Sequence, residues 1–507
     1  MAQTQTSAAR GESGGAPADE NPHHAKRWLI LAVIGLAQLM IVLDVTIVNI
    51  ALPDAQKALK FTDGDRQWIV TAYSLAFGSL LLLFGRVSDL VGRRLMFLVG
   101  LVGFAAASAL GGAAPNFEVL VTARAIQGLA GAMLAPAALS LLSTTFTEAK
   151  ERAKAFAVFG GIAGSGAAIG MLLGGVLTEY LNWRWTLFVN VAISVVAIAG
   201  AAMLIPRQSK TEDRPKLDIL GTVLVSLGLF GIVYGFANEE SHSWGAASTW
   251  GFLVVGVVLI VAFVAWQTRA SHPLLPLRVL LDRNRGGSYL AVFITGIGMF
   301  GVFLFLTYYL QAILLYSPVK TGLAFLPMVG VLMVTATVCT TQFYPRIGAK
   351  ILVFLGMLIG AGGMAWLTGI GLSSSYATNI LGPLLLIGIG MGAIFAPAMN
   401  AATSGIEPHD AGVASATVNT SQQIGGSIGT ALLNSLAASA TTTYLAGKGA
   451  AAKTDQIIQA NGAIHGYIVA FWWATAIFVA GAVICGLILR AGKPDPVDPD
   501  AVPAVHA

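Results

Sequence analysis

The stretch GRVSDLVGRR, residues 85–94, lies between two long apolar runs, residues 68–84 and 95–113. Its two glycines allow helix ends to approach closely and the chain to turn. Its aspartate can accept hydrogen bonds from a helix N-terminus or from an arginine on a neighbouring helix. An ordinary basic loop with one acid would need no such spacing. The segment therefore predicts a breakable charge lock between two helices, formed by Gly85, Asp89, Gly92, Arg93 and Arg94.

The apolar runs on either side of this turn are repeated along the whole chain. The 507 residues are 56% hydrophobic and only 10% charged, whereas soluble domains carry about 25% charged residues. A helix that spans a bilayer needs about 20 mostly apolar residues. The composition therefore predicts an all-α integral membrane protein and excludes an ordinary soluble enzyme.

Fourteen apolar runs are long enough to be transmembrane helices. An even number places both termini on one side, and loops on the cytoplasmic side are enriched in Lys and Arg. With cytoplasmic termini, 21 of the 29 Lys and Arg fall in inner segments and 7 in outer ones. The expected spans are residues 28–51, 68–84, 95–113, 117–142, 155–178, 185–205, 217–236, 250–266, 288–311, 321–342, 351–372, 379–403, 413–440 and 465–489.

A repeat divides these spans into two halves. The heptapeptide GAMLAPA at Gly131 recurs 261 residues later as GAIFAPA at Gly392, at matching depths in the fourth and twelfth spans. Chance recurrence is the alternative, because Gly, Ala and Pro are common in membrane helices. We expect two six-helix bundles with an inserted helix pair, since internal repeats are usual in secondary transporters. The predicted units are disordered cytoplasmic tails at 1–27 and 491–507, bundles at 28–206 and 287–490, and the pair at 217–267.

Four motifs give the chain a family resemblance. Residues 85–94 resemble the loop signature of the major facilitator superfamily, and LDVTIVNIALP at 43–53 is similar to the first-helix motif of its fourteen-helix drug:proton antiporters. Residues 124–128 resemble the fourth-helix motif, and NWRW at 182–185 with Asn190 resembles a segment of this branch. The resemblance implies a multidrug exporter in the plasma membrane, driven by proton antiport. Its partners would be a small lipophilic or cationic substrate, protons and the bilayer, and the chain is expected to be a monomer.

The fifth span departs from this resemblance. The antiporter motif usually contains Gly-Pro followed by Gly-Gly, but residues 170–175 read GMLLGG, without the proline. The small residues still allow close helix packing. Two other functions therefore stay open, which are export of one endogenous metabolite or lipid and, less favoured, proton-coupled uptake. The residues of the predicted packing motif are Gly166, Gly170, Gly174 and Gly175.

Asp44 and Arg124 are the two charged residues well inside predicted spans. Both lie about 10 to 12 Å below the outer surface at 1.5 Å per residue, and either would be costly alone in hydrocarbon. We therefore expect them to share one polar pocket. Burial opposes ionisation of Asp44 and Arg124 favours it, so a conformational change that alters either would load or release a proton. A permanent ion pair that only joins two helices is the alternative.

Several uncharged polar residues inside the spans are candidates for a substrate cavity. Hydrogen bonding between helices is the commoner use of such residues, so each has a structural alternative. The candidates are Gln38, Asn49, Gln127, Tyr308 and Asn400.

The remaining features exclude other classes of protein. The chain has no nucleotide loop of the GxxxxGK[ST] type, so we expect an ion gradient to supply the energy. The formal charge of +5 follows from loop cations and predicts no nucleic-acid partner. Two isolated cysteines and the absence of clustered His, Cys or acids predict no metal, no cofactor and no enzyme activity. A membrane-embedded enzyme or receptor is the least favoured alternative.

Overall fold

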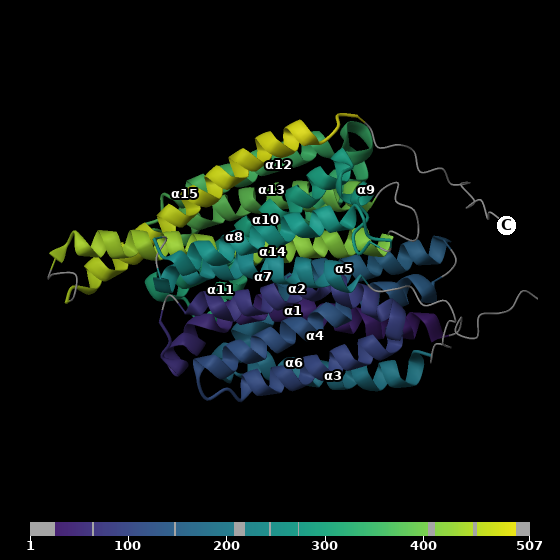
Figure 1. The fold of residues 1–507 in the computed structure, drawn as a ribbon. Coiled ribbons are helices and arrows are strands. Elements are labelled where there is room, and N and C mark those ends of the chain that lie inside the picture. The colour runs from purple at the N-terminus through teal and green to yellow at the C-terminus, as the bar shows by residue number, and fades with distance from the viewer. Residues whose placement is uncertain are drawn as a thin grey trace, which may run out of the picture.

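The structure is a computed structural model that describes residues 26–62, 65–146, 149–206, 218–242, 245–271, 273–403, 411–449 and 454–492. The regular elements in these ranges are helices, which form one elongated bundle (Figure 1). The predicted disordered tails lie almost wholly outside the described residues. Arg27 begins the first long helix of the chain and Ile488 ends the last one. We call the end of the bundle that holds these two residues the inner end.

Six long helices make up the first half of the bundle. Apolar residues dominate each of them, and Asn116 caps the start of α4, where its side chain accepts a hydrogen bond from the Val119 N–H at 3.1 Å. The helices are α1 (Arg27–Leu59), α2 (Arg66–Val91), α3 (Arg93–Gly112), α4 (Phe117–Thr145), α5 (Ala149–Tyr180) and α6 (Trp185–Leu204).

Two further helices, α7 (Ile219–His242) and α8 (Ala247–Gln267), form a closely packed pair. Asp218 precedes α7 and accepts hydrogen bonds from Trp266 Nε1 at 2.8 Å and from Gln267 Nε2 at 2.7 Å. Because Trp266 and Gln267 end α8, these bonds tie the inner ends of the pair together. The short α9 (Leu277–Leu280) follows.

The second half also contains six long helices, several of them with π-helical turns at one end. Ser317 begins α11 and accepts from the Lys320 N–H at 3.3 Å, and Pro318 occupies the first turn, where no N–H is needed. The helices are α10 (Arg283–Tyr308), α11 (Pro318–Val338), α12 (Tyr344–Leu367), α13 (Leu381–Thr403), α14 (Ala411–Ala446) and α15 (Gln456–Ile488), with π-helices η2 (Tyr309–Ile313), η3 (Cys339–Phe343) and η4 (Tyr376–Ile380).

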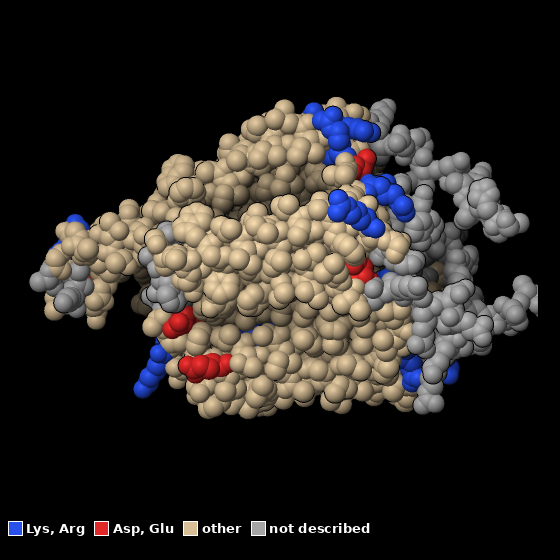
Figure 2. All heavy atoms as spheres, in the orientation of Figure 1, with Lys and Arg blue, Asp and Glu red and all other residues tan. Residues whose placement is uncertain are grey.

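The prediction of fourteen transmembrane helices is confirmed for the part of the chain that the structure describes. Eleven segments there are long and apolar enough to cross a membrane, and one of them, Pro318–Leu367, contains both α11 and α12. The helix α5 is only partly described over its side chains, and α14 is rich in Ser, Thr, Asn and Gln. The fully described part of α5, Ala168–Tyr180, is apolar but too short to cross a membrane by itself, and α14 is too polar to be recognised by composition, but the length and position of both helices complete the set. A broad band without charged side chains separates the two ends of the molecule (Figure 2).

The two halves are packed together at their outer ends. Buried residues of the second half form one apolar core with the outer part of α1, including Ile47 and Leu52, while the inner part of the first half has a core of its own. Between the halves, α2 packs against α14 and α5 packs against α11. The arrangement therefore joins the bundles on the outer side and leaves their inner cores largely separate.

The structure extends some predicted spans. The first helix continues from the expected end at residue 51 to Leu59, and α14 covers 36 residues instead of residues 413–440. In Figure 1, α14 and α15 project beyond the other helices at the outer end. The additional helical residues are more polar than the predicted spans. They could not be predicted from hydropathy, which identifies only the part of a helix that lies in hydrocarbon.

Candidate functional site

The candidate site lies inside the first half, where α1 and α4 face each other. Asp44 Oδ2 accepts a hydrogen bond from Arg124 Nη1 at 2.5 Å. The Asp44 side chain is 0% exposed and that of Arg124 is 2% exposed. The structure thus brings together the two residues that the sequence placed in one pocket. Low exposure makes the pair strongly interdependent, since removing one partner would leave an uncompensated buried charge.

Neutral side chains complete the contacts of the carboxylate. Asn190 Nδ2, from α6, donates to Asp44 Oδ1 at 2.7 Å, and Gln127 Nε2, from α4, donates to the same oxygen at 3.2 Å. Gln127 also donates to Ser108 Oγ on α3 at 2.8 Å, and its Oε1 accepts from Arg124 Nη1 at 2.9 Å. Three helices of one half, α1, α4 and α6, therefore meet at a single carboxylate, and α3 joins the network through Gln127.

The guanidinium of Arg124 is held from a second direction by α2. Its Nε donates to the Ile69 carbonyl oxygen at 3.0 Å, and its central carbon lies 4.5 Å from the centre of the Tyr73 ring. Gly128, one turn further along α4, lies so close to the Tyr73 backbone that a Cβ could not fit there. This close approach of α4 to α2 brings the carbonyl within reach of Arg124.

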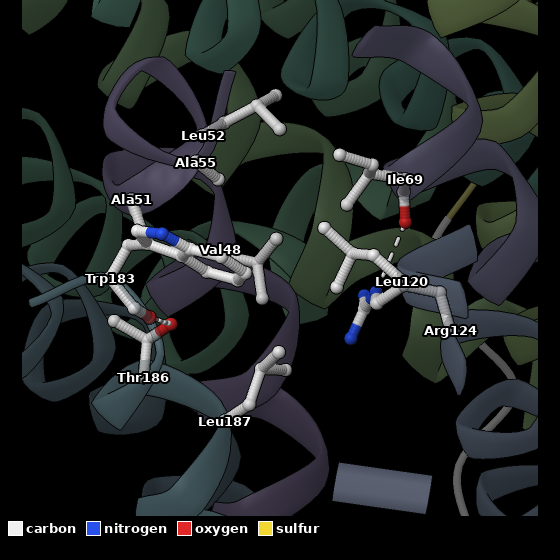
Figure 3. Close-up of a pocket in the computed structure, with 10 residues that line it drawn as sticks. All are labelled: Val48, Ala51, Leu52, Ala55, Ile69, Leu120, Arg124, Trp183, Thr186 and Leu187. Atoms are coloured by element: carbon white, nitrogen blue, oxygen red, sulfur yellow. Dashed lines mark hydrogen bonds between the residues drawn. The ribbon is translucent and has the colours of Figure 1, made fainter. Parts of the chain in front are cut away.

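A small pocket lies on the outer side of the ion pair (Figure 3). Its volume available to water is about 10 Å³, which is near the smallest space that one water molecule needs. Figure 3 shows Arg124 on one side of the pocket and the Trp183 ring on the other. The lining residues come from α1, α2, α4, α6 and the segment before α6, and they are Val48, Ala51, Leu52, Ala55, Ile69, Leu120, Arg124, Trp183, Thr186 and Leu187.

A second buried arginine joins the two halves at the outer side. Arg66, at the start of α2, donates from Nε to Asn434 Oδ1 of α14 at 3.1 Å. Its guanidinium carbon lies 4.3 Å from the centre of the Tyr308 ring on α10. The Tyr308 hydroxyl in turn donates to Gln56 Oε1 of α1 at 2.6 Å. We call Arg66, Asn434, Tyr308 and Gln56 the outer latch.

The cavity candidates fall in different places. Gln127 belongs to the Asp44 network and Tyr308 to the outer latch. Asn49 is buried and donates to the Val45 carbonyl oxygen of its own helix at 3.1 Å, and Asn400 does the same to Ala396 at 2.9 Å. Gln38 is half-buried. The structure does not bring these five residues into one group.

The segment 85–94 forms the inner turn between α2 and α3. Gly92 has φ +110°, a conformation that favours glycine and lets α3 begin immediately at Arg93. Arg94 Nη2 donates to the Ala202 carbonyl oxygen near the end of α6 at 2.8 Å. Gly85 lies beside Pro136 of α4 with room to spare. The side chain of Asp89, the acid of the predicted lock, lies outside the described residues.

The four glycines of the fifth span lie where α5 contacts two other helices. A Cβ on any of them would press against a neighbour, so their small size sets the distance between helices. Three face α1 and one faces α11 of the second half. The pairs are Gly166 with Val42, Gly170 with Thr46, Gly174 with Ile47 and Gly175 with Val319.

Comparison with known proteins assigns the family. The model of the Major Facilitator Superfamily matches residues 34–430. The chain belongs to this superfamily. The fold agrees, since a bacterial homologue of the human lysosomal transporter Spinster, in an inward-facing and unoccupied conformation, has a TM-score of 0.65 at 15% identity and covers 92% of this chain and 97% of its own. The POT family transporter PepTSo has a TM-score of 0.65 at 16% identity over 91% of this chain and 97% of its own.

Sequence relatives within this superfamily include resistance and export proteins. The puromycin resistance protein of Streptomyces alboniger is 48% identical over 92% of this chain and 92% of its own length. The cephamycin export protein of Amycolatopsis lactamdurans is 37% identical over 80% of this chain and 84% of its own. The transporter described here is therefore a relative of antibiotic exporters, and its family consists of transporters and not enzymes.

Sequence reasoning missed parts of this transporter's site. The sequence places Arg66 among the cations of the outer loops, because its position before Trp68 gives no sign that α10 and α14 bury it. Ser108 was overlooked within the small-residue run of α3. Asn190 carried a signal, since it lies in a motif of the branch, but only the fold shows that it donates to Asp44.

Proposed function

We propose that this protein exports lipophilic or cationic drugs, including antibiotics, across the plasma membrane in exchange for protons. Both termini lie in the cytoplasm in this proposal, and a single chain suffices for transport. The buried Asp44–Arg124 pair is the observation that carries the proton-coupling part. A carboxylate that is fully buried and has one cationic partner can change its protonation when that partner moves.

The coupling cycle follows from competition for the Asp44 carboxylate. In the outward-facing state a proton binds Asp44 and frees Arg124 from the ion pair, and the substrate leaves. In the inward-facing state Asp44 loses the proton, the pair forms again and a new substrate enters. Gln127 and Asn190 hold the carboxylate in place in both states, because amide N–H groups can donate to it whether or not it is protonated.

Alternating access requires that contacts between the halves break on one side at a time. The outer latch and the glycine contacts between α5 and α11 are closed in this structure. We assign the closed latch to the inward-facing state. On the inner side, the turn at 85–94 acts as the opposing lock, with Gly92 and Arg94 fixing the ends of α3 and α6 and Asp89 supplying the acid.

The export direction is supported by the relatives. Their names include resistance to or export of puromycin, cephamycin, tetracenomycin and lincomycin, at 32% to 48% identity. These compounds differ widely in structure, so a test panel should contain all of them and a fluorescent cationic dye. Protection by only one compound would favour a dedicated exporter.

The proposal is tested by substrate-driven proton release in everted membrane vesicles. With the interior acidified, adding a transported dye to wild-type vesicles should release lumenal protons. We expect Asp44→Asn to reach the membrane in normal amounts and to abolish this release. Glu118→Gln, an exposed acid in the first turn of α4, is the matched control and should behave as wild type. Normal proton release by Asp44→Asn would refute the proposal.

A further inference from the structure

We infer that the pocket beside Arg124 is a water site through which protons reach Asp44 from the outer side. This inference rests on the proposed proton coupling and adds its route. The route runs inside the first bundle, between α1, α4 and α6, and is separate from the seam between the two halves. The residues that define it are Ala51, Trp183 and Thr186, together with Arg124.

The position of the pocket supports a route from outside. Ala51, Leu52 and Ala55 occupy the outer third of α1, and Leu120 lies in the first turn of α4. Trp183 precedes α6 in the outer connection from α5. Arg124 lines the same pocket and contacts Asp44 directly. The pocket therefore lies on the outer side of the ion pair, among the outer parts of α1, α4 and α6.

Polar atoms at the pocket suit one water molecule. The Thr186 hydroxyl donates to the Trp183 carbonyl oxygen at 2.6 Å, which leaves its oxygen free to accept a hydrogen bond from water. The hydrogen bonds that Arg124 donates to protein acceptors use its Nε and Nη1. Its Nη2 finds no acceptor within the described ranges and can donate to a water oxygen. A water with two or more such partners is retained in protein interiors.

The Trp183 ring covers this pocket and is firmly placed. The Arg184 Nη1 donates to the carbonyl oxygens of Gly112 at 3.0 Å and Ala114 at 2.6 Å, at the end of α3. The Arg184 guanidinium carbon also lies 4.6 Å from the centre of the Trp183 ring. Trp183 and Arg184 are thus held against the end of α3, and the Trp183 ring forms a fixed cover over one side of the pocket.

The proton transfer needs no further reactant. A proton from outer water passes to the water in the pocket, which then donates a proton to the Asp44 carboxylate. One O–H bond forms on Asp44 while one breaks on the water. The Arg124 guanidinium keeps its charge and replaces the carboxylate with the water oxygen as its acceptor. The water in the pocket accordingly accepts a hydrogen bond from Arg124 when the Asp44 carboxylate becomes neutral.

Filling the pocket tests this route. We expect Ala51→Leu to slow proton release in the everted-vesicle assay by about tenfold, which corresponds to about 1.4 kcal/mol in activation free energy. Equilibrium dye binding from the inner side should stay at the wild-type value. Ala106→Leu makes the same substitution on the exposed face of α3 and should change neither. Hydroxyl-radical labelling of Trp183 and Leu187, which reports nearby ordered water, should fall in Ala51→Leu alone.

A second variant keeps the test decisive if Ala51→Leu fails to fold. Thr186→Val keeps the shape of the side chain and removes the hydroxyl, so it should slow release severalfold with normal expression. The route would be overturned if the folded pocket variants released protons at the wild-type rate and were labelled as wild type. If Asp44→Asn still lost proton release, the proposed function would remain intact. Normal release in Asp44→Asn would instead remove the proposed function itself.

Discussion

The two halves of this transporter share a fold but differ in chemistry. In the first half, α4 presents Arg124 and Gln127 to a buried acid. At the same 261-residue offset as the repeated heptapeptide, α13 has Leu385 and Gly388. Gly388 lies directly against the Met328 backbone of α11, so close packing replaces the polar contact. One half therefore holds the charges, and the other holds an apolar, aromatic core that includes Phe303 and Phe325.

This difference teaches that the repeated fold does not require the ion pair. Gly131 packs against the Phe77 ring of α2, and its counterpart Gly392 packs against the backbone of α11 at Leu332, so both glycines allow a close helix contact. Both helices also carry the proline of the motif, Pro136 and Pro397. The geometry survives without charge in the second half. In the proposed cycle the charges of the first half serve proton coupling, and we expect the second half to contribute more to substrate contact.

The largest effect is expected from removing Arg124, the cation of the buried ion pair. Arg124→Ala should destabilise the protein by about 3 to 5 kcal/mol, because Asp44 is left buried and charged, and its amount in the membrane should fall. Leu385→Ala, at the equivalent place in the half-buried face of α13, should cost clearly less. Thermal unfolding in detergent and membrane expression measure both.

A double variant separates stability from coupling. Asp44→Asn with Arg124→Ala removes both charges, so the folded protein should return while substrate-driven proton release stays absent. Equal losses from Arg124→Ala and Leu385→Ala would contradict the division of roles between the halves.

A smaller effect is expected where the halves meet. Arg66→Gln should weaken the outer latch by about 2 kcal/mol, the typical value for a desolvated cation–π contact, and favour the outward-open state more than tenfold. Ile424 packs against Gly78 of α2, ten residues deeper along α14 than Asn434 of the latch. A cysteine at this position, Ile424→Cys, should then react with an impermeant maleimide from outside. Cys339 and Cys485 are both buried and are replaced by Ala in this background.

The control for the latch keeps the positive charge. Arg66→Lys retains attraction to the Tyr308 ring but loses the planar fork, so labelling should lie between that of the wild type and that of Arg66→Gln. Labelling that is unchanged in Arg66→Gln would show that the latch does not hold the outer side closed.

The smallest effect on transport is expected in the inserted pair, which belongs to neither half. Burial alone would raise the pKa of the Asp218 carboxyl, but hydrogen bonds from Gly221, Trp266 and Gln267 outweigh it and hold the pKa below its usual value. The stabilising contribution is therefore present at neutral pH and is lost as the pH falls through this lowered pKa. Asp218→Asn should lower stability by about 1 to 2 kcal/mol and leave proton release unchanged.

The measurement is the midpoint of thermal unfolding as a function of pH. Wild type and Asp218→Asn should differ at pH 7 and converge under strongly acidic conditions. A loss of proton release in Asp218→Asn would mean that the inserted pair takes part in coupling.

Much of this architecture could be predicted from sequence because hydrocarbon imposes simple rules. The length of the apolar runs predicted the helices. The free-energy cost of burying an isolated charge in hydrocarbon predicted that Asp44 and Arg124 would lie together. Burial of Arg66 could not be predicted, since it depends on Tyr308 and Asn434, which are more than 200 residues away. The partners of Gln127 were also hidden, because the sequence does not specify how α4 is rotated against α1 and α3.

The ion pair also has a consequence for how the chain is made. Asp44 and Arg124 are 80 residues apart, so at about 5 to 20 residues per second the ribosome adds the arginine some 4 to 16 s after the aspartate. During that interval the newborn first helix carries an unmatched acid. It must wait in a hydrated place near the insertion machinery, or enter the bilayer protonated, until the fourth helix arrives.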